Sequence, residues 1–223
     1  MMLILPFLIA AVVGYFLGAL PFGYLVARAH GVNIFKAGSG NPGATNVKRV
    51  LGSKAGNTVY MLDALKGVVA AGLPLVRCLA LRSSDHLDGN DLYSASMLGV
   101  TSLVAAVLGH SFSCFTRFKG GKGVATASGG LLVLMPLPGL IAVLVWIITF
   151  LASRYVSLAS ILASLSVPTA AWWLDLPLAL KIVATVLSVL VVVRHYANIR
   201  RLLAGTEHRW TRKPQPSSIL PHG

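Results

Sequence analysis

Residues 124–153 read VATASGGLLVLMPLPGLIAVLVWIITFLAS, and this stretch contains no Asp, Glu, Lys or Arg. One helix needs about 20 apolar residues to cross the hydrocarbon core of a membrane, so the stretch is longer than a single span requires. Pro136 and Pro138 remove backbone hydrogen-bond donors near its middle, which favours a tight reversal over one long helix. We therefore expect two spans here, at about residues 124–136 and 138–153.

The rest of the chain contains further apolar stretches of spanning length. Of the 223 residues, 56% are hydrophobic and only 11% are charged, a composition that excludes a soluble domain. The sequence predicts an all-α integral membrane protein with about seven transmembrane helices. Six spans is the competing number, which applies if the chain does not reverse at the prolines. The other five predicted spans lie at about residues 2–27, 56–81, 92–110, 156–174 and 178–194.

The positive charges predict the orientation of these spans. The chain has 19 Lys and Arg against 6 Asp and Glu, and positive residues accumulate on cytoplasmic loops. With seven spans, fifteen of the 19 positive residues fall on one side of the membrane, and most acidic residues fall on the other. We therefore expect the N-terminus outside and the C-terminus in the cytoplasm. The residues predicted on the cytoplasmic face are Arg28, Lys36, Lys48, Arg49, Lys54, Arg117, Lys119, Lys122, Arg154, Arg194, Arg200, Arg201, Arg209, Arg212 and Lys213.

The chain shows no internal repeat and no second domain. Residues 1–204 are expected to form a single transmembrane domain that carries the activity of the chain. Residues 205–223 contain three prolines and are interpreted as a disordered cytoplasmic tail without function. Cys78 and Cys114 have no paired spacing, so the sequence supports neither a disulfide nor a zinc site.

The first predicted cytoplasmic loop contains GSGNPGATNVKR at residues 38–49. Its glycines allow the backbone to turn so that N–H groups converge on an anion, its hydroxyl and amide side chains add donors, and an arginine can hold phosphate with two hydrogen bonds. The alternative is a flexible surface turn whose cations face lipid headgroups. As a phosphate-binding loop, it would act through Gly38, Ser39, Asn41, Gly43, Thr45 and Arg49.

The second segment, residues 109–126, ends in KGGKGVAT and leads directly into a span. Gly120 and Gly121 stand where the amides at a helix N-terminus point outward, which suits an oxyanion or a phosphate, and Lys119 and Lys122 add positive charge. The pattern is not a Walker A loop, because a glycine follows the lysine. Phenylalanines recur every three residues at 112, 115 and 118; interfacial anchoring is preferred for them over an acyl path.

Two further polar segments are predicted on the same face, at residues 153–160 and 194–201. The first contains Ser157 and Ser160. In the second, His195 and Asn198 are three residues apart, so they share one side of a helix and could hydrogen-bond a substrate hydroxyl together. The second and third segments contain no carboxylate, which makes a Ser-His-Asp triad hard to assemble.

Taken together, these segments resemble the bacterial PlsY family of acyl-phosphate:glycerol-3-phosphate acyltransferases. The resemblance extends over GSGNPGATN from Gly38, LDALKG from Leu62, the GH and KGGKGVAT motifs, RYVSLAS, and RHYANIRRLL from Arg194. It implies transfer of a fatty acyl group from acyl phosphate to the 1-hydroxyl of glycerol 3-phosphate in the bacterial inner membrane. It implies neither a cofactor nor a metal, and no nucleic-acid partner. A functional link to the enzyme that makes acyl phosphate and to the next acyltransferase is also implied.

The resemblance also assigns roles to single residues. Ser39, Asn41, Thr45, Arg49 and Lys122 would bind the two phosphates, Gly120 and Gly121 would supply amides, and Ser160, His195 and Asn198 would position glycerol 3-phosphate. The family is thought to lack a protein base, so the phosphate of the donor would accept the hydroxyl proton. Pro42 stands where the family has an aliphatic residue, and Asn33 with Lys36 stands near an Asp and an Arg of the family, which leaves the docking of the first loop open.

Two other functions remain open at this point. A transporter of an organic phosphate would place charged groups near the bilayer midplane, often with repeat symmetry. An acyltransferase that uses a thioester donor could use His86 as a general base oriented by Asp91, which form the histidine, four residues, aspartate pattern of acyl-CoA-dependent glycerolipid acyltransferases. The predicted orientation puts this pair outside, away from cytoplasmic thioesters.

Overall fold

A computed structural model describes residues 4–80 and 89–210, and every regular element in these ranges is a helix. This confirms the all-helical prediction for the described residues, and each predicted span overlaps a helix, although the bounds differ by up to three residues at the helices Ser53–Ala80, Gly89–Ser111 and Pro136–Ser153. His86 of the thioester pattern lies outside the described residues. The helices are α1 (Ile4–Ala19), α2 (Phe22–Ala29), α3 (Ala44–Leu51), α4 (Ser53–Ala80), α5 (Gly89–Ser111), α6 (Val124–Leu134), α7 (Pro136–Ser153), α8 (Val156–Trp173), α9 (Leu178–Arg194) and α10 (Tyr196–Leu203), with a short 3-10 turn at Cys114–Thr116.

Length and hydropathy identify five helices or helix pairs that could cross a membrane within the described residues. A sixth is formed if α9 and α10, which bend by 59°, count as one span. Helix α6 has 11 residues, which gives about 16 Å at 1.5 Å per residue, roughly half the hydrocarbon core. The chain is therefore a multi-pass membrane protein, and seven spans stays a prediction.

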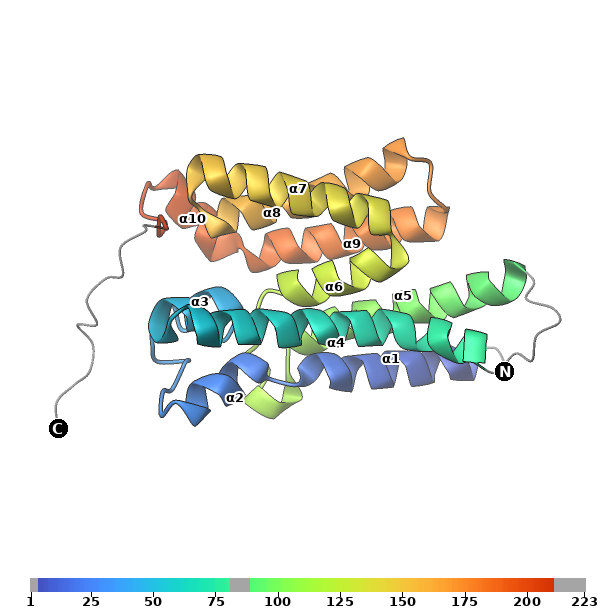
Figure 1. Cartoon of the computed structure of the whole chain (residues 1–223), viewed down its shortest axis with the longest axis horizontal. Helices are drawn as coiled ribbons and strands as arrows, with labels where there is room; N and C mark the ends of the chain where they lie inside the picture. Colours follow the sequence, from blue (N-terminus) through green and yellow to red (C-terminus); the bar gives the residue numbers. More distant parts are fainter. Residues whose placement is uncertain (1–3, 81–88, 211–223) are drawn as a thin grey trace.

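The chain reverses between α6 and α7, which run in opposite directions (Figure 1). The break lies at Met135, and Pro136 is the first residue of α7. Proline is favoured at that position because the first turn of a helix does not use its N–H groups. The predicted reversal is confirmed, but the prolines begin the second helix and do not form the linker.

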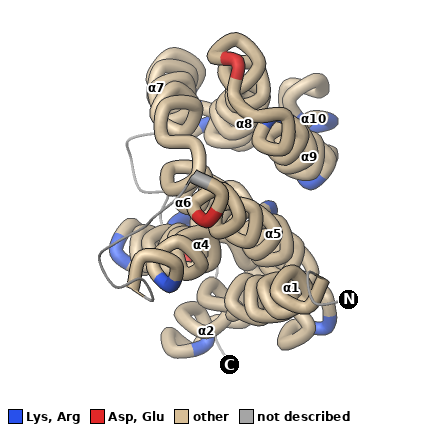
Figure 2. The backbone as a smooth tube through the Cα atoms, turned by 90° about the vertical axis from the view of Figure 1, so that its right-hand side faces the viewer, with Lys and Arg blue, Asp and Glu red and all other residues tan. Residues whose placement is uncertain are grey.

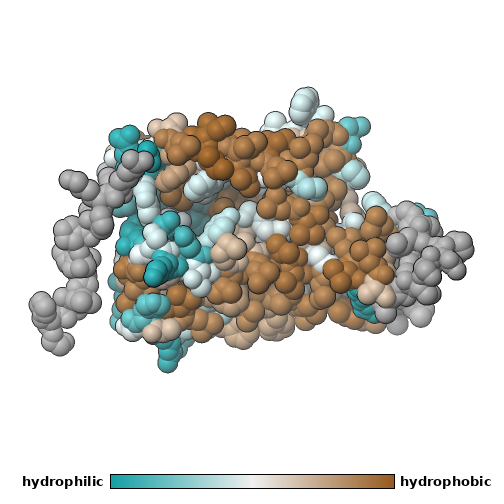
Figure 3. Space-filling view, viewed as in Figure 1, coloured by the Kyte–Doolittle hydropathy of each residue, from teal (hydrophilic) through white to brown (hydrophobic). Residues whose placement is uncertain are grey.

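The helices form two lobes, α1–α6 and α7–α10, with α6 facing the second lobe (Figures 1 and 2). Close approach of α4 and α6 depends on Gly67 and Gly129: a Cβ on Gly67 would overlap the carbonyl of Thr126, and one on Gly129 would overlap the carbonyl of Ala64. Small residues at such contacts are typical of helices that pack within a membrane. The visible outer surface of both lobes is mainly apolar (Figure 3).

The polar segments of the chain gather at one end of the molecule, which we call the polar end. Helices α2, α3 and α10 lie there, and the start of α1 lies at the opposite end (Figure 1). Hydrophilic residues concentrate at the same end (Figure 3).

Residues 205–210, predicted to begin the tail, lie against the helices at the polar end. The amide of Trp210 donates a hydrogen bond to the carbonyl of Arg154, 2.9 Å away. The Lys48 ammonium lies 5.4 Å from the centre of the Trp210 ring. The expected start of a disordered tail at residue 205 is therefore wrong, because these residues find partners on the body of the protein. Residues 211–223 lie outside the described residues.

Candidate functional site

A cavity of about 850 Å³ is lined by both lobes. At the polar end its walls carry cationic, hydroxyl and amide groups; toward the other end they become apolar, with Leu131, Val167 and Leu187. The cavity reaches the apolar surface between α4 and α7, where its lining residues Tyr60 and Val143 are 45% and 36% exposed. Polar residues show in a recess between these helices (Figure 3). The shape suits an amphiphile with an anionic head.

The first loop is shaped by Asn46, which is 2% exposed in the first turn of α3. Its Oδ1 accepts a hydrogen bond from the amide of Ser39 at 2.8 Å, and its Nδ2 donates to the carbonyls of Ala37 at 3.0 Å and Asn41 at 2.9 Å. Gly38 has a φ of +58°, and a side chain there would collide with Asn46 Oδ1. The Asn46 side chain therefore fixes the conformation of the loop. The sequence alone does not indicate this role, because only the fold shows that the side chain points into the loop.

Ser39, Thr45 and Arg49 from this region all line the cavity. Thr45 and Arg49 are four residues apart on α3, so they lie on one face of that helix. The Nε atom of Arg49 is buried and has no hydrogen-bond partner among the described residues. Burial lowers the pKa of Arg49, while the charge of Glu207 opposes this shift. A buried donor without a partner is costly, so this arginine is suited to an anionic ligand.

The second segment forms a tight turn in front of α6. Arg194 donates hydrogen bonds to the carbonyls of Gly120 at 3.2 Å and Gly121 at 2.9 Å. The amide of Gly121 donates to the carbonyl of His110 at 3.0 Å, and a Cβ on Gly121 would overlap the His110 ring. The expectation that Gly121 offers its amide to a phosphate is therefore wrong: that amide is already used, and the glycine is needed for close packing.

Lys122 extends from this turn into the cavity and is held by the other lobe. Its ammonium donates to Asn198 Oδ1 at 2.5 Å, and Asn198 Nδ2 donates to Glu207 at 2.7 Å. Burial lowers the pKa of Lys122 to about 8, with Glu207 opposing the shift and Arg201, Arg49 and Arg194 adding to it. Asn198 is thus engaged in positioning Lys122, a role that its predicted pairing with His195 did not include.

Glu207 lies in the segment that the sequence predicts to be a tail, so the sequence alone does not indicate it as a site residue. Its carboxylate accepts hydrogen bonds from Ser157, Asn198 and Arg201, at 2.8, 2.7 and 2.8 Å. Burial alone would raise the pKa of Glu207, but these hydrogen bonds outweigh burial and hold the pKa below its ordinary value. The carboxylate is therefore an ionised anchor for the polar end of the cavity and a poor proton acceptor.

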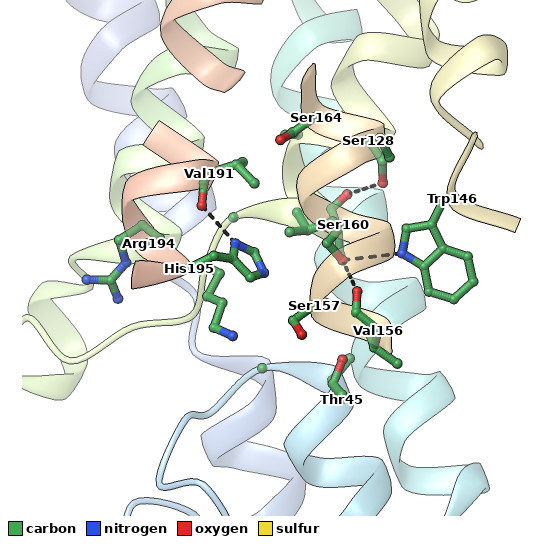
Figure 4. Close-up of a pocket in the computed structure, with 18 of the residues that line it drawn as sticks. Thr45, Ser128, Trp146, Val156, Ser157, Ser160, Ser164, Val191, Arg194 and His195 are labelled. Atoms are coloured by element: carbon green, nitrogen blue, oxygen red, sulfur yellow. Dashed lines mark hydrogen bonds between the residues drawn. The ribbon is translucent and has the colours of Figure 1, made fainter. Parts of the chain in front are cut away.

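Ser160 faces the cavity from α8, and His195 faces it from the bend between α9 and α10 (Figure 4). The Nδ1 atom of His195 lies 2.7 Å from the carbonyl of Val191. Because a carbonyl can only accept, Nδ1 carries the proton and Nε2 is left as an acceptor. The hydroxyl of Ser160 donates to the carbonyl of Val156 at 2.9 Å. The hydroxyl of Ser157 is directed to Glu207 instead.

A second carboxylate, Asp63, borders the cavity from α4. Its Oδ1 lies 2.8 Å from the Lys66 ammonium and 3.5 Å from Nδ1 of His110. Lys66 also donates to the carbonyl of Leu20, at the break between α1 and α2, over 3.1 Å. Asp63 and Lys66 therefore form an ion pair, and His110 links this pair to the turn that contains Gly121.

The structure brings together most, but not all, of the predicted site residues. Lys119 and Gly120 line a separate cavity of about 430 Å³, which shares Asn41 and Arg194 with the main one. Gly38 and Gly121 line neither cavity and shape the two turns. The predicted residues on the main cavity are Ser39, Asn41, Gly43, Thr45, Arg49, Lys122, Ser160, His195 and Asn198.

Comparison with known proteins gives a consistent result. The family model described as glycerol-3-phosphate acyltransferase matches residues 8–205. A glycerol-3-phosphate acyltransferase of Aquifex aeolicus is 41% identical over 91% of this chain and 98% of its own length. One from Agrobacterium fabrum is 42% identical over 90% of each chain.

Solved structures agree with this comparison. The crystal structure of PlsY, an integral membrane glycerol 3-phosphate acyltransferase, in its glycerol 3-phosphate form superposes with a TM-score of 0.80, at 40% identity, covering 92% of this chain and 96% of that one. The lysophosphatidic acid form gives 0.78 at the same identity, with 92% and 95% covered. The predicted resemblance is confirmed, and the chain belongs to the PlsY family of glycerol-3-phosphate acyltransferases, which act in phospholipid biosynthesis.

Proposed function

We propose that this enzyme transfers a fatty acyl group from acyl phosphate to the 1-hydroxyl of glycerol 3-phosphate, giving lysophosphatidic acid and inorganic phosphate. The observation that carries the proposal is one cavity with a cationic polar end and an apolar wall that reaches the membrane-facing surface. Both substrates bear a phosphate, and only the donor bears an acyl chain. Related PlsY structures in glycerol 3-phosphate and lysophosphatidic acid forms support this acceptor and product.

The charges at the polar end support two phosphate groups. Arg49, Lys122 and Arg201 all line the cavity, and Arg49 has a buried donor left over for an external oxygen. In a site shielded from water, such cations stabilise the leaving phosphate and the oxyanion that develops on the acyl carbonyl. Ser39 and Thr45 add hydroxyl donors for the phosphate oxygens.

The proton of the attacking hydroxyl goes to the phosphate of the donor in this mechanism. Among the described residues, two carboxylates border the cavity, but neither suits a general base. Asp63 is held by Lys66 and His110, and Glu207 accepts three hydrogen bonds. The leaving phosphate is adjacent to the reacting carbonyl and becomes more basic as the bond to the acyl carbon breaks. The site therefore contributes positioning and electrostatic stabilisation.

The donor is tested with purified protein and radiolabelled glycerol 3-phosphate. We expect lysophosphatidic acid to form when palmitoyl phosphate is the sole donor and no product to form from palmitoyl-CoA, because the donor phosphate is needed both as leaving group and as proton acceptor. Product from the thioester alone would overturn the proposed donor and return attention to the His86 pattern. If folded protein forms no product from either donor, the result would favour the alternative that the protein transports an organic phosphate.

We also propose that the polar end faces the cytoplasm of a bacterial inner membrane, with the N-terminus outside. The charge distribution of the loops supports this orientation. In a background without Cys78 and Cys114, single cysteines at Lys54 and Asp175 should differ in labelling by a membrane-impermeant maleimide. Asp175→Cys should be labelled in intact spheroplasts, and Lys54→Cys only after permeabilisation. The reverse pattern would refute the orientation.

A further inference from the structure

The hydroxyl of Ser160 has two partners within its own lobe (Figure 4). It donates to the carbonyl of Val156 at 2.9 Å and accepts from Nε1 of Trp146 at 3.2 Å. Ser160 is 5% exposed and lines the cavity. Its direction is therefore set by the protein before any substrate arrives.

The number of hydrogen bonds that the Ser160 hydroxyl can still form limits its role toward a ligand. A serine hydroxyl has one proton and two lone pairs. The proton is taken by a carbonyl that can only accept, and one lone pair is taken by an indole N–H that can only donate. One lone pair remains, so Ser160 can accept a hydrogen bond from a ligand but cannot give one. A nucleophilic role is also disfavoured, since no base receives the proton.

We propose that Trp146 is a positioning residue for the acceptor substrate: it holds Ser160 so that its remaining lone pair accepts a hydrogen bond from a hydroxyl of glycerol 3-phosphate. This inference rests on the proposed placement of the glycerol backbone at Ser160. Neither the family resemblance nor the predicted site included Trp146.

The placement of Trp146 supports a fixed geometry. Trp146 and Phe150 are stacked on α7, with ring centres 5.1 Å apart and planes at 19°, and both rings border the cavity. Ser160 lies on α8, the neighbouring helix of the same lobe. The indole and the hydroxyl therefore stay together if the two lobes move relative to each other. Ser157, one turn earlier, is different: its hydroxyl is held by Glu207 from the segment after α10.

The test is Trp146→Phe, which keeps an aromatic ring at this position and removes the N–H donor together with part of the indole ring system. With palmitoyl phosphate saturating, we expect kcat/KM for glycerol 3-phosphate to fall between about 3- and 10-fold, the effect of one lost hydrogen bond. The KM for palmitoyl phosphate should not change. Trp173→Phe is the matched control, because Trp173 is 81% exposed and does not line the cavity. Thermal unfolding of each variant checks that the fold is retained.

A double-mutant cycle separates positioning from a general packing defect. In a Ser160→Ala background, Trp146→Phe should have no further effect on kcat/KM, because the indole acts only through the serine. Unchanged kinetics in Trp146→Phe, or additive losses in the double variant, would overturn the inference. A wild-type enzyme that does not use palmitoyl phosphate would instead refute the proposed function, so the two failures can be told apart.

Discussion

Lys122→Ala should lower kcat/KM on the order of 10³-fold, the loss expected when a group that stabilises developing negative charge is removed. The ammonium is held in the cavity by Asn198 at 2.5 Å, whereas Lys48, the other described lysine on the cavity wall, donates to Asn57. Lysophosphatidic acid formation from palmitoyl phosphate gives the measurement. Lys119→Ala is the informative comparison, because Lys119 is exposed on the separate cavity and its loss should be far smaller. Equal losses in the two variants would contradict the assignment.

The pH profile gives this prediction a second signature. Lys122 has a pKa of about 8 in the free enzyme, so its charge is present below that pH and lost above it. We expect kcat/KM to fall as the pH rises through about 8. A bound phosphate dianion attracts the ammonium and raises its pKa, so the fall in kcat should occur at higher pH. Substrate phosphates, whose second pKa is about 6, are already dianionic there. A Lys122→Arg variant that retains activity should lose the alkaline fall; if it does not, another group titrates.

Arg49→Ala should lower kcat/KM on the order of 10²- to 10³-fold, through loss of a phosphate contact that positions the substrate. Arg49→Lys should recover little of this loss. The lysine keeps the charge, but a single ammonium cannot replace the planar pair of donors that fits a phosphate, nor the buried Nε that has no partner among the described residues. The loss should appear in binding of glycerol 3-phosphate, measured by calorimetry, as well as in turnover.

Lys54→Ala controls for the change in net charge. Lys54 is exposed at the start of α4 and does not line the cavity, so the activity of the Lys54→Ala enzyme should remain near that of the wild type. Full activity in Arg49→Lys would show that charge alone is sufficient at this position and would remove the argument from geometry.

The membrane class and the helices could be predicted from the sequence because a run of about 20 apolar residues is stable as a helix surrounded by lipid. The number of spans was harder to fix, since α6 is short and the length rule cannot tell a half-span from a full one. The polar loops also could be found, because glycines and hydroxyl residues between apolar runs are rare in a membrane protein. Four of these loops could be placed on one face from charge alone.

Residues that act through tertiary contacts could not be found in this way. Asn46 resembles any loop amide until the fold turns it inward, and Trp146 resembles any aromatic residue of a span. Glu207 could not be identified because the prolines that follow it give residues 205–223 the composition of a disordered tail. Its three hydrogen-bond partners lie 50, 9 and 6 residues earlier in the chain, so no local pattern connects them.

The opening of the cavity between α4 and α7 has a consequence for how the enzyme senses its donor. Tyr60 and Val143 border this opening on an apolar surface, so the proposed acyl phosphate donor would reach the site from the bilayer by diffusing in two dimensions. The concentration that matters is then the mole fraction of donor among membrane lipids, and the volume of the surrounding solution has no direct effect. At a fixed amount of donor, inert phospholipid would slow the reaction by dilution within the plane, and membrane growth itself would lower the rate of lipid synthesis.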